Sequence, residues 1–423
     1  MQWDERTKKW VAIGAFVVFT IFIGWALYFT FFRVPDELTF PPTISQDQLQ
    51  IPQLPQVPPS VTEEVPPPET ISPPAEVTEP PLTAVPPTQL PTPIATGRET
   101  QLGVVTNRFL TNSIPAHQGI AAYDPLSGNF VRVETDGKIS ALSDKKFFGV
   151  TNINWGPNGN QAILGFADGS NLYFDFTRNI GIRLPDEIRE PSFNQNGTSI
   201  AFKWIDPRDP NRNYIGVGRP DGGGLRFVEH IGRKSRITQI KWSPDERFVA
   251  TVHDPYNPNA QQIFFIGQNQ ERFGSVIVPG LSARYIYTPN SKLMLASTID
   301  MERDGNHVLQ IISVESGNTG TVLTTGLKTT VEKCVITPDS TTAFCAVPRN
   351  LPRGAGAVPE LAVGVFDDFY QLDLKDGKAK VLALPVIDGT QNVIGTNLSL
   401  ARDGTELWFT NSVDGRLLSI RLK

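Results

Sequence analysis

Cysteine and histidine are scarce in this 423-residue sequence, which contains two cysteines and four histidines. The histidines, His117, His230, His253 and His307, do not show the spacing of metal ligands, so we expect no metal and no bound cofactor. The G-x-S-x-G motif of serine hydrolases is also missing, because residues 280–284 lack its final glycine. Asp367 and Asp368 with Asp373 could form an acid pair, but turn positions at strand edges are the simpler explanation. We assign no catalytic residue.

A basic excess is absent as well, since the formal net charge is −5. Residues 1–33 carry +2 and residues 34–97 carry −8, which leaves +1 for the rest of the chain. A large region so close to neutrality has no general field that would attract nucleic acid. We therefore expect no nucleic-acid partner.

One long uncharged run is present, at residues 11–32. As a helix its 22 residues would extend ~33 Å at ~1.5 Å per residue, enough to cross a hydrocarbon core of ~30 Å. A cleaved signal peptide is the alternative, but its apolar core is shorter, about 7–15 residues, and ends at small residues. Here the run ends in Phe31, Phe32, Arg33 and Val34, which offer no cleavage site. The sequence predicts a transmembrane helix at residues 11–32.

The charges that flank this run predict its orientation. Arg6, Lys8 and Lys9 precede it, whereas only Arg33 follows it closely. Basic residues stay on the cytoplasmic side, so residues 1–10 would form a cytoplasmic tail. We expect a cell-membrane protein with a single span and everything after residue 33 outside, in the periplasm or the extracellular space.

The next region, residues 33–103, is predicted to be a disordered, proline-rich linker. Residues 41–96 contain 17 prolines in 56 positions and no aromatic residue, so they cannot bury enough apolar surface to fold. Extended polyproline II geometry at ~3.1 Å per residue would make the segment a spacer. A set of proline-rich ligand motifs is the alternative interpretation.

Residues 104–423 are predicted to form one all-β domain. Asp-Gly occurs eight times after the linker, and between apolar runs it predicts hairpins with type I′ turns, whose two central residues both need a positive φ. One pattern also recurs, an apolar strand, a Ser/Thr-Pro-Asp-Gly-like turn and a second apolar strand. The first strands of its six copies end at residues 155, 193, 242, 287, 336 and 400. This periodicity is typical of a β-propeller.

The clearest copy, Trp242-Ser243-Pro244-Asp245, resembles the TolB-type β-propeller repeat, with Glu246 in place of the family's glycine. The Gly-His and Trp-Asp signatures of WD-type repeats are missing. The resemblance covers residues ~120–423 and implies a fold that serves as a binding platform or as an accessory domain of enzymes.

The number of blades follows from counting the repeats. Six turns are visible, and residues 104–150 supply what resembles the later strands of one more blade. The C-terminal copy has three evident strands, so we expect an N-terminal strand to complete it and close the ring. The count favours seven blades, with six as the alternative.

The connections between the second and third strands of the blades share one face of the ring, and four consecutive ones are long. They span residues 205–213, 253–262, 298–307 and 348–359. Insertions on one face often mark a binding surface. The predicted partner-binding residues are Asp206, Arg208, Asp209, Arg212, His253, Asp254, Tyr256, Asp300, Arg303, Asp304, Arg349 and Arg353.

Two classes of function remain open. The favoured one is a membrane-tethered binding platform or scaffold for a protein or a cell-envelope polymer. The alternative is a hydrolase or lyase that acts on the envelope through the central channel, for which acidic and histidine side chains at the channel mouth would argue.

The two cysteines, Cys334 and Cys345, flank the turn at residues 338–341 symmetrically. A symmetric hairpin would place them directly opposite one another, at a Cα separation that a disulfide accepts. An outside location would allow such a bond to persist. Two buried free thiols are the alternative.

Overall fold

A computed structural model describes residues 90–116, 119–134, 137–314 and 320–423. All of them belong to one compact unit, Val85–Lys423. Within these ranges no helix has the length and apolar character needed to cross a membrane. The predicted anchor at residues 11–32 lies outside them, as does most of the predicted linker.

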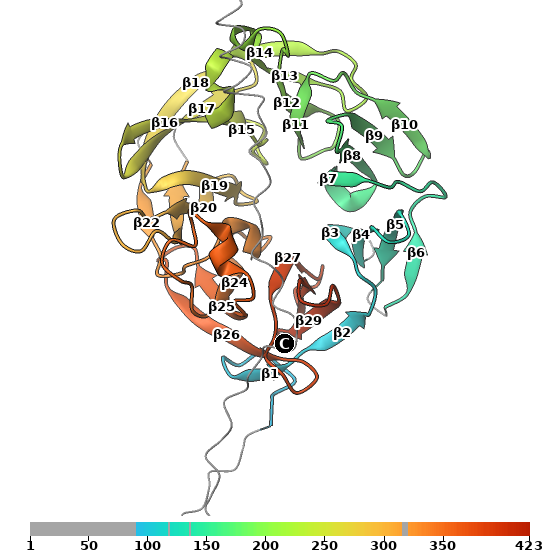
Figure 1. Ribbon diagram of the computed structural model, residues 1–423, viewed down its shortest axis with the longest axis vertical. Coiled ribbons are helices and arrows are strands. Elements are labelled where there is room, and N and C mark those ends of the chain that lie inside the picture. The colour runs from blue at the N-terminus through green and yellow to red at the C-terminus, as the bar shows by residue number, and fades with distance from the viewer. Residues whose placement is uncertain (1–89, 117–118, 135–136, 315–319) are drawn as a thin grey trace, which may run out of the picture. The chain divides into compact units, whose positions relative to one another are not determined.

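The described residues form seven sheets, each built around a blade of four antiparallel strands, and one sheet carries a fifth strand. Figure 1 shows the blades following one another around a ring. Blade 1 comprises β3 (Thr111–Ala116), β4 (Gly119–Asp124), β5 (Asn129–Val133) and β6 (Ile139–Ala141). Blade 2 comprises β7 (Val150–Trp155), β8 (Gln161–Phe166), β9 (Asn171–Asp175) and β10 (Ile180–Arg183). Blade 3 comprises β11 (Ile188–Phe193), β12 (Ile200–Trp204), β13 (Tyr214–Gly218) and β14 (Arg226–His230). Blade 4 comprises β15 (Thr238–Ile240), β16 (Phe248–Asn257), β17 (Ala260–Gly267) and β18 (Arg272–Pro279).

The remaining blades complete the ring. Blade 5 comprises β19 (Leu281–Tyr287), β20 (Leu293–Ile299), β21 (His307–Ser313) and β22 (Val322–Thr324). Blade 6 comprises β23 (Cys334–Ile336), β24 (Thr342–Pro348), β25 (Asp367–Asp373) and β26 (Ala379–Val386), and blade 7 contributes β27 (Gly395–Leu400), β28 (Glu406–Asn411) and β29 (Leu417–Arg421). Short 3₁₀ helices lie in the connections: η2 (Pro157–Gly159), η3 (Pro210–Arg212), η4 (Gly232–Ile237), η5 (Val331–Lys333) and η6 (Pro359–Ala362).

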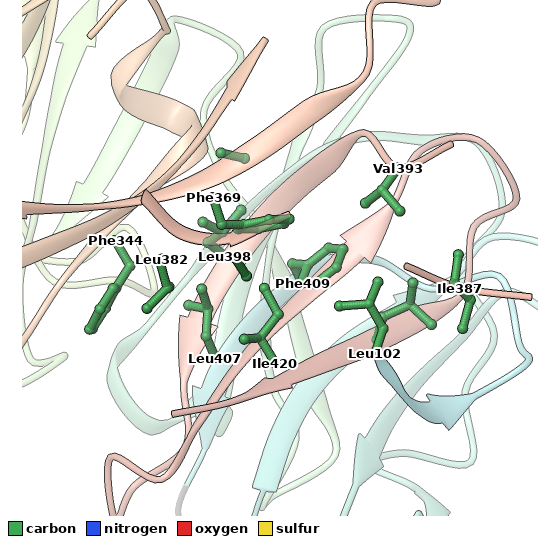
Figure 2. Packing of buried hydrophobic residues seen from close by; sticks show 13 residues of the cluster. Leu102, Phe344, Phe369, Leu382, Ile387, Val393, Leu398, Leu407, Phe409 and Ile420 are labelled. Carbon is green, nitrogen blue, oxygen red and sulfur yellow. The ribbon is translucent and has the colours of Figure 1, made fainter. Parts of the chain in front are cut away.

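Two short strands near residue 100 close the ring. Strand β2 (Gly103–Thr106) pairs antiparallel with β29 as the fourth strand of blade 7, and β1 (Glu99–Gln101) pairs parallel with β26 of blade 6. Leu102, between them, belongs to a core cluster with residues of blades 6 and 7 such as Phe369 and Phe409 (Figure 2). The predicted closure by an N-terminal strand and the seven-bladed β-propeller are confirmed, and the six-bladed alternative is excluded.

Two boundaries differ from the prediction. Residues 90–103 belong to the folded unit, so the predicted domain start at residue 104 is too late. Blade 1 is also complete, because β3 supplies a first strand before the three strands that the sequence suggested. That strand went unnoticed because its connection to β4 lacks the Pro-Asp-Gly pattern.

The recurring turn between first and second strands has a common backbone conformation. In six blades its last position is left-handed, at Gly159, Gly197, Glu246, Ser291, Ser340 and Gly404, with φ between 57° and 69°. Three of the six are not glycine, and all three bond to the preceding blade. Glu246 Oε1 accepts from the side-chain amide of Asn194 at 3.0 Å. Ser291 Oγ accepts from the N–H of Asp245, and Ser340 Oγ accepts from the N–H of Asn290. We infer that a serine here offsets its backbone strain with a bond between blades.

The Asp-Gly turns are of a different type from the one predicted. All eight glycines have a positive φ, but among the described aspartates of these pairs only Asp388 does. The pair Asp388-Gly389 therefore forms the two-residue hairpin turn that joins Ile387 to Thr390. At the other described pairs only the glycine is left-handed, which suits a type I turn followed by one left-handed residue.

The hydrophobic core is divided among the junctions of the ring. Seven clusters of buried residues occur, and each joins two adjacent blades. The largest residues include Phe248, Tyr285 and Tyr287 between blades 4 and 5. Each blade thus depends on both neighbours for its burial.

Candidate functional site

The connections between second and third strands lie at the same end of the ring as the starts of the first strands, as the alternating strand directions require. They are short in blades 1, 2 and 7 and long in blade 3 (residues 205–213), blade 5 (residues 300–306) and blade 6 (residues 349–366). We call these three loops, together with the hairpin tip at residues 256–259 of blade 4, the loop face.

Blade 4 departs from the prediction, because strands β16 and β17 extend through most of the expected loop and leave only residues 258–259 between them. His253 is buried, with 7% of its surface exposed, so its prediction as a partner-contacting loop residue is wrong. Asp254 lies on β16 and forms an ion pair with Lys234 of η4 at 2.7 Å. Tyr256 is exposed near the hairpin tip.

The loop of blade 3 is organised by its own carboxylates. Asp206 accepts hydrogen bonds from the N–H groups of Arg208 and Asp209 and pairs with Arg212 at 3.6 Å. These backbone bonds hold the pKa of Asp206 below its ordinary value. Asp209 accepts from the N–H of Asn211 and caps η3. The side chains of Arg208 and Arg212 remain exposed.

The loops of blades 4, 5 and 6 are joined to one another. Arg353 donates to the carbonyl oxygen of Arg303 at 3.0 Å, and the N–H of Gly354 donates to that of Asp304 at 2.7 Å. On the other side, Asn259 of the blade 4 hairpin donates to Glu302 at 2.7 Å. These bonds connect three successive blades into one surface.

The other predicted loop residues support this arrangement. Asp300 accepts from the N–H groups of Glu302 and Arg303. Asp304 pairs with Lys328, and the hydrogen bond from Lys328 lowers the pKa of the Asp304 carboxyl group. Arg349 is half-buried and donates to Asp368 at 2.8 Å. Asp300, Asp304 and Arg349 therefore fix the loops.

A cavity of about 600 Å³ lies beneath the loops of blades 5 and 6. Much of its wall is apolar, with Ile299, Leu351, Ala355, Val365 and Ile394 among the lining residues. The loop at residues 349–366 contributes most of this apolar wall, including part of η6.

Charged side chains line the same cavity. Arg284 and Glu332 form an ion pair at 3.3 Å, and Lys333 lies 2.6 Å from both carboxylate oxygens of Asp367. Asp367 is fully buried and also accepts from the N–H of Gly395, which ties blade 6 to blade 7. Burial raises the pKa of Asp367 and lowers that of Lys333, and each charge opposes the other's shift.

The interpretation of Asp367 as a strand-edge turn residue is therefore wrong. Sequence reasoning also missed Arg284, Glu332 and Lys333. Their partners are 34 to 48 residues away in the chain. A pattern search over one repeat cannot find such pairs.

His307 is the histidine on the cavity wall, and its ring Nδ1 is buried with no hydrogen-bond partner among the described residues. Burial lowers the pKa of His307, and the nearby Glu332 opposes this shift. In the described ranges, no three His, Cys, Asp or Glu side chains come together as metal ligands. The carboxylates at the cavity, Glu332 and Asp367, are both paired with cations.

The loop face also exposes large apolar side chains. Met301, Val358, Leu361 and Val363 are between 45% and 82% exposed, and Tyr256 is 56% exposed. Arg303 and Arg353 belong to the same loops as these residues of blades 5 and 6. Interfaces between proteins are enriched in aromatic residues, methionine and arginine.

The remaining predicted pair is Cys334 and Cys345. They lie directly opposite one another on β23 and β24 and form a disulfide, and the described residues contain no free cysteine.

Comparison with solved structures supports the fold. The β-propeller domain of Cps50 (Swd1) from Myceliophteria thermophila aligns with a TM-score of 0.53 and 8% identity, over 76% of this chain and 100% of that domain. An oligogalacturonate lyase in complex with manganese aligns with a TM-score of 0.51 and 11% identity, over 76% and 92% of the two chains. At such identities the likeness concerns the fold alone. No family model and no curated protein sequence matches. The chain is thus a seven-bladed β-propeller protein, and the likeness to these two structures selects no activity for it.

Proposed function

We propose that this protein is a membrane-tethered binding platform whose loop face captures a partner protein outside the cytoplasm. The single observation that carries the proposal is the joining of the loops of blades 4, 5 and 6 by hydrogen bonds between blades. A surface that is fixed in this way loses less conformational entropy when a partner binds than separate mobile loops do. Long loops that arose by drift alone would need no such bonds.

The exposed side chains favour a protein over an envelope polymer. Met301, Leu361, Val363 and Tyr256 present apolar surface, and exposed apolar residues that cluster on one face mark interaction sites. Arg208, Arg212 and Arg303 are exposed on the same face, where Arg212 pairs with Asp206 and Arg303 pairs with Asp300. Such a mixture of apolar groups and paired charges suits a partner with an apolar patch and a polar rim.

The tether and the outside location rest on the sequence. The uncharged run at residues 11–32 supplies the anchor, and the basic residues before it supply the orientation. The proline-rich linker would hold the propeller away from the membrane surface. The Trp242–Asp245 turn supports a TolB-type origin for the propeller.

The test is capture of one defined partner by the full-length protein. Proteins cross-linked to the loop face in intact cells are identified, and the recovered partner is then tested for direct binding to the purified full-length chain. A variant with Arg208, Arg212 and Arg303 changed to serine and the loop at residues 349–366 shortened should lose binding. The melting temperature and the circular dichroism spectrum should show that the variant still folds.

A matched control changes Arg178, Lys375 and Lys378, which are exposed in turns at the opposite end of the ring, to serine. It should bind the partner normally. Binding that is lost in the control but kept in the loop variant contradicts the proposal. Turnover of an envelope glycan or peptide that depends on His307 or Glu332 would instead support the hydrolase or lyase alternative.

A further inference from the structure

A second cavity, of about 380 Å³, lies in the wall of the central channel at blades 3, 4 and 5. First strands β11, β15 and β19 contribute to it, and they are the innermost strands of their blades (Figure 1). Its charged lining residues are Glu190, Lys203, Arg236, Lys241, Arg284 and Glu332. The cavity shares Arg284 and Glu332 with the larger cavity under the loop face, so the two meet at that ion pair.

The charges of this wall are not balanced. Lys203 pairs with Glu190 at 2.6 Å, and Arg284 pairs with Glu332 at 3.3 Å. Lys241 and Arg236 form no ion pair with any described residue. Two positive charges therefore face one small cavity without a carboxylate partner.

Hydrogen-bond donors are also in excess. The Nζ of Lys241 donates to the carbonyl oxygen of Tyr285 at 2.9 Å, which uses one of its three N–H groups. The guanidinium group of Arg236 makes no hydrogen bond to a described residue, and its five N–H donors remain available. Burial lowers the pKa of Lys241, and Glu332 opposes this shift, which is the behaviour of a cation that lacks a close counter-charge.

We propose that this channel cavity binds a small hydrophilic anion, a carboxylate or phosphate about the size of one sugar unit, between Lys241 and Arg236. An anion would supply the missing counter-charge, and ammonium and guanidinium groups form strong charge-assisted hydrogen bonds with both acid groups. The volume falls within the range of small-molecule sites. On the wall, Gln239 donates from Nε2 to the carbonyl oxygen of Ala283 and keeps Oε1 as an acceptor for a ligand hydroxyl group.

Calorimetric titration of the full-length protein with glucuronate and with glucose 6-phosphate tests the proposal, with glucose as the neutral control. One or both acids should bind and glucose should not, and the stronger binder identifies the acid group. Lys241→Met and Arg236→Gln should each weaken binding about tenfold or more. Lys375→Met, a matched loss of one charge in an exposed turn of blade 6, should leave binding unchanged.

The proposal is overturned if neither acid binds at about 10 mM, or if both channel variants bind as well as the wild type. It is also overturned if glucose binds as strongly as the acids. Should Lys241→Met fail to fold, Arg236→Gln decides the question, because Arg236 is exposed. Partner capture by the loop face does not depend on these two residues, so either proposal can fail without the other.

Discussion

The rings of His253 and Tyr285 lie stacked across the junction between blades 4 and 5, with 6.1 Å between their centroids. The hydroxyl group of Thr251 bridges them, at 2.8 Å from His253 Nε2 and 3.0 Å from the Tyr285 hydroxyl. His253 Nδ1 lies 3.2 Å from Gln261 Oε1. This buried polar chain joins two blades within an otherwise apolar junction.

The first prediction concerns acid stability. Burial lowers the pKa of His253 from 6.5 to about 4. The unfolded chain therefore takes up a proton before the folded chain does, and stability is fully present above pH 6.5 and lost as the pH falls towards 4. The loss should be about 3 kcal/mol.

Urea unfolding of the full-length protein at a series of pH values measures this loss. His253→Gln should flatten the dependence between pH 6.5 and 4, whereas the exposed His230→Gln should retain it. An unchanged slope in His253→Gln would contradict the assignment.

The second prediction concerns the ion pair of Lys333 and Asp367. Lys333→Met should lower the free energy of unfolding by about 3–5 kcal/mol at neutral pH, because it leaves a fully buried carboxylate without its cation. The pKa of Asp367, already raised by burial, should rise further. The variant should therefore regain stability as the pH falls and Asp367 takes up a proton.

Denaturant unfolding at neutral and acidic pH checks this result. The double variant Lys333→Met/Asp367→Asn should be more stable at neutral pH than Lys333→Met alone, since it removes the unpaired charge. Equal stability of the two variants would show that the carboxylate is not the cause.

The third prediction concerns the recurring turn. A Cβ added at Gly404 meets no atom within 4 Å, but the residue has a φ of 66°. Gly404→Ala should therefore lower the free energy of unfolding by about 1 kcal/mol through backbone strain alone. Gly326→Ala is the control, because it adds a Cβ in equally open space without a left-handed backbone and should not destabilise the protein.

The fourth prediction concerns the disulfide. Cys334→Ala/Cys345→Ala should lower the free energy of unfolding by up to roughly 3 kcal/mol. The decrease is smaller if the two ends of the hairpin stay close together in the unfolded chain, because the disulfide then restricts that chain less. Mass spectrometry after alkylation without reduction should find a linked peptide in protein from its native membrane. Complete alkylation of both thiols would rule the bond out there and weaken the case for an outside location.

The fifth prediction concerns topology. Protease added to intact cells or spheroplasts should cut the proline-rich linker and release the propeller, because Arg6, Lys8 and Lys9 favour a cytoplasmic N-terminus. Full protection of the propeller together with an accessible N-terminus would contradict the predicted orientation.

Local sequence was enough to identify the blades. A turn is encoded by about four or five consecutive residues and a strand by six or seven, so both can be recognised in a short stretch of sequence. The six copies of the pattern, from Trp155 to Leu400, therefore predicted the ring and the order of its strands. Cys334 and Cys345 could be paired for the same reason, since both flank one short turn. The first strand of blade 1 was not predicted, because the turn that follows it lacks the Pro-Asp-Gly pattern of the other blades.

The tertiary structure alone decided which side chains meet. His253 is buried where its ring stacks on Tyr285 of the next blade, a contact between two repeats. Lys333 meets Asp367, and Lys241 and Arg236 face one cavity with Arg284, only because the ring brings different blades together. The periodicity of the repeat predicts where each strand lies. The side chains at equivalent positions, however, differ from one copy of the repeat to the next. Charge balance at the junctions therefore depends on contacts between blades that no single repeat contains.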